Sequence, residues 1–147
     1  MGERSKVYMT DLRCRPGVSL LNKLEKLMRT AGIGEINFER KLVAIKMHFG
    51  EPGNLAFLRP NYAKVVADVV KSLGGVPFLT DCNTLYVGRR KNALDHLDTA
   101  YENGFSPFST GCHVLIADGL KGTDEALVPI DGDYIKEAKI GRAIMDA

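Results

Sequence analysis

The sequence predicts an α/β fold, a three-layer sandwich with a mostly parallel sheet built from βαβ units. Short runs of β-prone apolar residues alternate along the chain with amphipathic stretches of helical length. Glycines and prolines separate the two kinds of segment, which is the order typical of parallel sheets. The length of 147 residues and the hydrophobic content of 45% fit one globular domain over residues 1–147.

The first predicted elements are a strand over residues 7–10, which Asp11 ends, and a helix over residues 20–31. Ser19 is suited to cap this helix because its hydroxyl can accept a hydrogen bond from a backbone N–H group. Gly32 supplies the stop at the carboxyl end. The apolar residues of the helix fall on one stripe, which predicts one buried face.

The next three elements form the clearest βαβ unit of the chain. A strand over residues 42–48 leads into the glycine-rich loop 49–54, and Pro60 fits the first turn of a helix. The predicted buried face of this helix comprises Val65, Val66, Val69, Val70 and Leu73. Two adjacent glycines, Gly74 and Gly75, end the helix before a strand over residues 76–81.

The remainder of the chain continues the alternation. A loop over residues 82–88 precedes a helix over 89–103, whose apolar stripe contains Ala93, Leu94, Leu97, Ala100 and Tyr101. Two further strands are predicted over residues 113–117 and 126–130, and a short helix over 142–147.

Polar residues end the predicted strands, and this pattern predicts a ligand site. In open parallel sheets, ligands bind outside the carboxyl ends of the strands. We therefore expect Asp11, His48, Asp81 and Asp118 at one edge, with Glu51, Asn54, Asn83 and Tyr86 added by the loops. One imidazole with several carboxylates can bind a divalent metal or perform acid–base catalysis, and His48, Glu51 and Asp81 are the candidates for both. The alternative is that the aspartates only form turns and cap helices.

Three further features bear on this edge. Gly50 and Gly53 flank Glu51 and allow a ligand to approach the backbone closely. Arg59 and Arg89 lie at predicted helix amino ends, where an anionic ligand could bind, although both could be solvated surface charges. For His96 and Cys82 we favour structural roles, respectively a half-buried histidine with satisfied nitrogens and an inert thiol.

Composition excludes several classes of protein. The three cysteines, Cys14, Cys82 and Cys112, form no C-x-x-C pair, which argues against a disulfide framework and a four-thiolate centre and favours a cytoplasmic location. A net charge of +2 argues against nucleic-acid binding, and the short apolar runs argue against membrane insertion. Sequence motifs of P-loop NTPases, Rossmann domains and α/β-hydrolases are missing.

Several motifs resemble one family in order and spacing: LVAIKMHFGEPGN at 42–54, PFLTDCNTLY at 77–86, and IADG at 116–119. The family is that of uncharacterised iron–sulfur-centre proteins, catalogued as domain of unknown function 362. The resemblance extends from Lys6 to Ala147 and implies either an N-terminal portion of a longer protein or a member of the family that has lost the rest. It implies [4Fe–4S] clusters further along, with no cluster ligand in this chain, because no position here matches those cysteines.

Three functional interpretations remain open from the sequence. The chain could be the α/β part of a metal-associated or redox protein, a non-catalytic module binding a small anion, or a metal-dependent hydrolase or isomerase with His48 as base. If a further strand belongs to the sheet, a second copy could cover the resulting edge, so a homodimer is also expected.

Overall fold

The computed structural model describes residues 4–147. The chain divides into two compact units, residues 1–37 and residues 38–147, and each is described by itself. The prediction of one domain over residues 1–147 is not tested by this division. No helix among the described residues is both long and apolar enough to cross a membrane.

Unit 1 contains the helix α1 (Leu20–Thr30) and the short 3₁₀ helix η1 (Ile33–Glu35). The helix confirms the prediction, since Ser19 and Asn22 form a capping box at its start and Gly32 adopts a positive φ of 94° after its end. The strand predicted over residues 7–10 is wrong, because this segment pairs with no strand in the described chain. Asp11 therefore ends no strand. Its carbonyl and its carboxylate accept hydrogen bonds from the Lys23 ammonium instead.

Unit 2 carries the other elements in the order βαβααβββα. They are β1 (Leu42–Lys46), α2 (Pro60–Ser72), β2 (Val76–Asp81), α3 (Ala93–Glu102), α4 (Pro107–Thr110), β3 (His113–Ile116), β4 (Glu125–Pro129), β5 (Glu137–Gly141) and α5 (Arg142–Met145). Pro60 stands in the first turn of α2, as predicted, and Gly74 follows the helix with a φ of 86°. Of these elements, α4 and β5 were not predicted.

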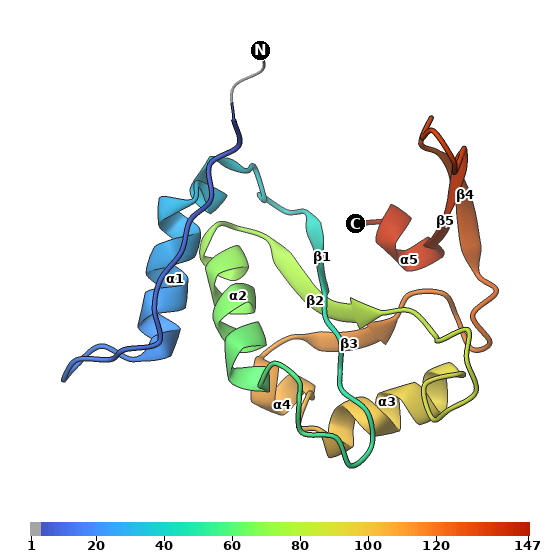
Figure 1. The fold of residues 1–147 in the computed structure, drawn as a ribbon, viewed down its shortest axis with the longest axis horizontal. Coiled ribbons are helices and arrows are strands. Elements are labelled where there is room, and N and C mark those ends of the chain that lie inside the picture. The colour runs from blue at the N-terminus through green and yellow to red at the C-terminus, as the bar shows by residue number, and fades with distance from the viewer. Residues whose placement is uncertain (1–3) are drawn as a thin grey trace. The chain divides into compact units, whose positions relative to one another are not determined.

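The first three strands form one parallel sheet in the order β1-β2-β3 (Figure 1). Leu42 pairs with Val76 and Phe78 pairs with His113, so all three carboxyl ends lie at the same edge. The connections run through α2 and through α3 and α4, which makes two βαβ units. The α/β class and the parallel sheet are thereby confirmed.

The core of unit 2 lies between this sheet and its helices. Its buried side chains include Leu79 and Ile116 from the sheet, Ala63 and Ala67 from α2, and Ala100 from α3. The small residues Ala63 and Ala67 of α2 pack against the sheet, whereas Val65 and Val66, which we predicted to be buried, are only partly buried. On the opposite face of the sheet, Leu42, Val76 and Leu115 remain about half exposed.

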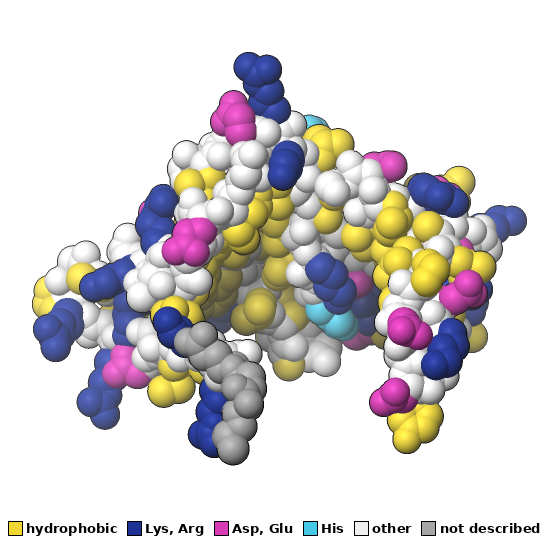
Figure 2. Space-filling model, turned by 90° about the horizontal axis from the view of Figure 1, so that it is seen from above, with side chains coloured by type: hydrophobic (Ala, Val, Ile, Leu, Met, Phe, Trp, Pro, Cys, Tyr) yellow, Lys and Arg dark blue, Asp and Glu magenta, His cyan; other side chains and the backbone are white. Residues whose placement is uncertain are grey.

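The strands β4 and β5 form a separate antiparallel hairpin in which Pro129 pairs with Glu137. The helix α5 follows β5 directly and contacts both strands. Hydrophobic side chains are exposed on the hairpin and its turn, among them Leu127, Ile130 and Ile135. Figure 2 shows such side chains between charged ones on its right side, where the hairpin lies.

Candidate functional site

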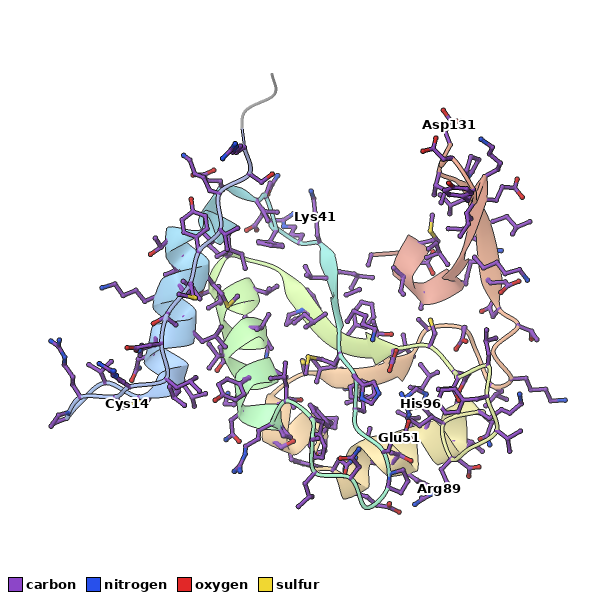
Figure 3. The ribbon with its side chains drawn as sticks, in the orientation of Figure 1. Cys14, Lys41, Glu51, Arg89, His96 and Asp131 are labelled. Carbon is purple, nitrogen blue, oxygen red and sulfur yellow. The ribbon has the colours of Figure 1, made fainter. Side chains whose placement is uncertain are left out.

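The carboxyl edge of the parallel sheet gathers most of the predicted site residues. His48 lies two residues beyond β1, Asp81 is the last residue of β2, and Asp118 lies two residues beyond β3. Figure 3 shows Glu51 and His96 at this end of the sheet and Lys41 at the other end of β1. The topological rule therefore places these three strand-end residues correctly, while Asp11 belongs to unit 1.

Arg90 is the centre of the polar contacts at this edge. Its side chain is only 4% exposed, and Nε donates a hydrogen bond of 3.0 Å to Oε1 of Glu51. Nη2 donates to the same oxygen and to the Tyr86 hydroxyl, which itself donates to Glu51 Oε1 at 2.6 Å. These donors hold the pKa of Glu51 below its ordinary value, and Arg90 is the largest cause. The loop after β1 and the loop after β2 are thus joined through one buried guanidinium.

Asp81 extends the cluster formed by Arg90, Glu51 and Tyr86 to the end of β2. Its Oδ1 accepts a hydrogen bond of 2.9 Å from the Cys82 backbone N–H and lies 3.4 Å from Lys46 Nζ. Its Oδ2 lies 3.5 Å from Arg90 Nη1 and 3.7 Å from His96 Nε2. Asp81 thereby faces three basic side chains while its own side chain is 10% exposed.

His96 is fully buried in α3, contrary to the half-buried position that we predicted. Its ring lies edge-on to Phe49, with a centroid distance of 5.9 Å. Neither ring nitrogen has a hydrogen-bond partner among the described residues, so the expected satisfied histidine is also wrong. Burial lowers the pKa of His96 and outweighs the opposing effect of Asp81, which makes the imidazole neutral at neutral pH.

Asp118 and Asn83 form a second polar pair beside the cluster. The Asn83 backbone N–H donates to both carboxylate oxygens of Asp118, at 3.0 and 2.9 Å, and its side-chain amide donates to Oδ1 at 2.9 Å. In the sequence, Cys82 lies between Asp81 and Asn83. Burial, followed by the charges of Asp118 and Asp81, raises the pKa of the Cys82 thiol, which supports the interpretation of an inert side chain.

His48 is exposed and takes its orientation from the glycine-rich loop. Its Nδ1 accepts a hydrogen bond of 3.0 Å from the Gly50 N–H, so the neutral ring carries its proton on Nε2. Gly50 has a φ of 84°, and a Cβ there would lie 2.6 Å from the Asn103 amide nitrogen. Only glycine fits this turn. Asn54 makes a local turn, since its Oδ1 accepts from the Ala56 N–H at 2.8 Å.

The two arginines predicted at helix amino ends have different outcomes. Arg59 directly precedes α2, as expected, and its side chain makes no capping hydrogen bond to that helix. The helix α3 begins at Ala93 with Asn92 as its cap, so the placement of Arg89 at its start is wrong. Arg89 forms two hydrogen bonds with the Glu102 carboxylate, at 2.7 and 2.8 Å.

Sequence reasoning assigned no role in the site to three residues of this cluster: Lys46, Arg90 and His96. The helical pattern did contain a signal for His96, because Ala93, His96 and Ala100 share a face at spacings of three and four, and all three are buried. Arg90 gave no such signal, since it stands between Arg89 and Lys91 in a run that reads as surface charge.

Metal ligands do not converge in the described part of the chain. No group of three His, Cys, Asp or Glu side chains within residues 4–147 is placed so that it could hold a metal ion. Glu51 and Asp81, two of the three predicted ligands, both face the Arg90 guanidinium. The metal site at His48, Glu51 and Asp81 stays a prediction.

Comparisons with known proteins give the family but no characterised relative. No curated protein and no solved structure matches the chain. The model of a family described as a domain of unknown function, DUF362, matches residues 43–147, which span the sheet except for Leu42, the hairpin and every residue of the cluster. The chain therefore belongs to the DUF362 family.

Proposed function

We propose that the carboxyl edge of the sheet binds a small molecule through an anionic group, with Lys46 and His48 as the donors. The observation that carries this proposal is the balance of donors and acceptors at the edge. Each carboxylate there already faces donors of the protein, whereas Lys46 and His48 keep donors that no described residue uses. A ligand that completes this balance supplies an acceptor, which is an anionic oxygen.

Each carboxylate at this edge has a hydrogen-bond donor within the protein. Glu51 accepts from Arg90 and Tyr86, and Asp118 accepts from Asn83. Asp81 accepts from the Cys82 N–H and faces Arg90 at 3.5 Å. A second cation would compete with a buried arginine for Glu51 and Asp81, which disfavours a cationic ligand there.

Lys46, at the end of β1, and His48, two residues further on, both have N–H groups that no described residue accepts. The Lys46 side chain is 64% exposed, and an ammonium has three N–H groups, of which one suffices for the 3.4 Å contact with Asp81. The ladder continues past β1, since the Met47 N–H donates to the Thr80 carbonyl, and from the alternation of side chains along an extended chain we expect Lys46 and His48 on the same side. Nε2–H of His48 is the second free donor, because Gly50 already occupies Nδ1.

The same hydrogen bond bears on the alternatives. A general base or a metal ligand at Nε2 needs a lone pair there, which moves the proton to Nδ1 and breaks the bond from Gly50. The observed arrangement therefore favours donation by His48 over proton abstraction or metal binding. The hydrolase or isomerase interpretation has no observation of its own to support it.

Calorimetric titration of the whole chain with inorganic phosphate and with citrate tests the proposal. Lys46→Met is expected to weaken binding about tenfold or more, because it removes a charge-assisted hydrogen bond. Lys41→Met is the matched control, since Lys41 is exposed at the opposite end of the same strand. Equal affinity of wild type and Lys46→Met, or an equal loss in Lys41→Met, would refute the proposal.

Other expectations from the sequence stay predictions. The iron–sulfur and redox association implied by the family resemblance is tested by the iron content and the absorbance near 400 nm of the anaerobically purified natural gene product. The homodimer is tested by sedimentation of the chain, and the cytoplasmic location by cell fractionation.

A further inference from the structure

An exposed apolar tip lies in the loop after β2, which contacts the carboxyl edge of the sheet through the Tyr86 hydroxyl and Glu51. Leu85 and Val87 are 97% and 90% exposed, and Tyr86 between them is 55% exposed. Three consecutive exposed apolar residues are costly in water unless something covers them. The tip belongs to the loop that follows β2, whose first residues, Cys82 and Asn83, bind Asp81 and Asp118.

The loop that carries the tip is closed by hydrogen bonds of its own. The Thr84 N–H donates to the Arg90 carbonyl at 2.9 Å, and the Lys91 N–H donates to the Gly88 carbonyl at 3.2 Å. The Lys91 ammonium donates to the Leu85 carbonyl at 3.0 Å. The exposure of the tip therefore belongs to an ordered loop, which presents its side chains in a fixed place.

Tyr86 is fixed most firmly. Its hydroxyl donates to Glu51 and accepts from Arg90, so the guanidinium lies at the hydroxyl end of the ring, with its carbon 5.9 Å from the ring centroid. Glu51 raises the pKa of the Tyr86 phenol, which keeps the hydroxyl protonated. The ring is thereby held by its hydroxyl while 55% of the residue stays exposed, which leaves ring surface for a planar group to stack on.

We infer that Tyr86 is a stacking platform for a planar aromatic ring of the same ligand whose anionic group Lys46 and His48 bind. Contacts run without a break from Tyr86 through Glu51, Arg90 and Asp81 to Lys46. A chain of contacts within the protein therefore links the ring to Lys46. This inference rests on the proposed function and adds the ligand class, an anion joined to an aromatic ring, as in a nucleotide or an aromatic phosphate.

Two pairs of probes, each differing only by the ring, test the inference by calorimetric titration. AMP is compared with ribose 5-phosphate, and phenyl phosphate with methyl phosphate. We expect the ring to strengthen binding about tenfold in at least one pair, a typical effect of one stacked ring. A preference in the first pair alone indicates a nucleotide, and one in the second pair indicates a simple aromatic anion.

Variants of Tyr86 complete the test. Tyr86→Leu is expected to abolish the preference for the ring, whereas Tyr86→Phe retains most of it because the face remains. Tyr101→Leu is the control, since Tyr101 is a 47% exposed tyrosine on α3. If all four probes bind without a ring preference, or if Tyr86→Leu keeps it, the platform is refuted and the anion site stands. If none of them binds, both proposals are refuted.

Discussion

The replacement Arg90→Met tests whether the buried guanidinium holds the carboxyl edge together. Methionine keeps a long unbranched side chain but lacks the guanidinium, so Glu51 and Asp81 lose their common partner. Removal of one member of a buried ion pair costs about 3–5 kcal/mol. Glu51 is 33% exposed and Asp81 keeps Lys46 and the Cys82 N–H, so we expect the lower end, about 3 kcal/mol.

The assay is urea unfolding of the whole chain followed by circular dichroism, with Arg89→Met as the matched control. Arg89 is the adjacent residue and also binds a carboxylate, but its side chain is 44% exposed. We therefore expect little change in the free energy of unfolding of that variant. A double-mutant cycle of Arg90→Met with Glu51→Gln should give a coupling energy of about 0.5–3 kcal/mol.

The pH dependence provides a second check. Arg90 holds the pKa of Glu51 below its usual 4.5, so the stability that this pair contributes is present above that pH and is lost as the pH falls below it. The difference between wild type and Arg90→Met should shrink accordingly on acidification. The reasoning fails if Arg90→Met unfolds at the same urea concentration as wild type, or if Arg89→Met is equally destabilised.

Three further predictions concern the neighbouring elements. Because burial lowers the pKa of His96, an unfolded chain binds a proton below the usual 6.5 that the folded chain excludes, so wild type should lose more stability than His96→Gln as the pH falls from neutrality through 6.5. Gly50→Ala should lower the free energy of unfolding by about 2–5 kcal/mol, because its Cβ meets Asn103 and φ is positive, whereas Gly53→Ala, which meets nothing, should cost about 1–2 kcal/mol. Asn92→Ala should cost about 1 kcal/mol, because the side chain accepts the Leu94 and Asp95 N–H groups at the start of α3.

Each of these three has an outcome that contradicts it. Equal pH dependence of wild type and His96→Gln would show that His96 does not titrate differently in the folded chain. Equal destabilisation of the two glycine variants would remove the role of the clash with Asn103. An unchanged melting temperature of Asn92→Ala would place the start of α3 elsewhere.

Local sequence signals were sufficient to predict the helices whose ends are marked by a proline, a glycine or a capping residue. Pro60 and Gly74 delimit α2, and Ser19 and Gly32 delimit α1, because these residues act on the ends of their own helix and need no partner from elsewhere in the chain. Strands depend on their partners. The segment at 7–10 is β-prone but finds no strand to pair with, whereas β5 carries a weak pattern and is formed through its pairing with β4.

Some residues of the candidate site could likewise be predicted from the sequence, whereas others depend on contacts in the folded chain. Topology alone brings His48, Asp81 and Asp118 to one edge, since the ends of parallel strands must meet there. The burial of Arg90 beside the exposed Arg89 depends on where Glu51 lies in space, which no spacing in the sequence reveals. The face of α3 that is buried, with His96 on it, was likewise set by its contacts with the core.

The register of the sheets also bears on the order in which the chain folds. Every parallel pairing, such as Leu42 with Val76 or Phe78 with His113, closes a long loop that contains a helix, and the entropy of that closure must be met before the pairing stabilises the chain. The turn of the hairpin joins Pro129 to Glu137 and forms on a scale of about 1–10 μs. The β4–β5 pair is therefore able to form early and locally, while the edge that carries the candidate site is completed only when the two βαβ crossovers close.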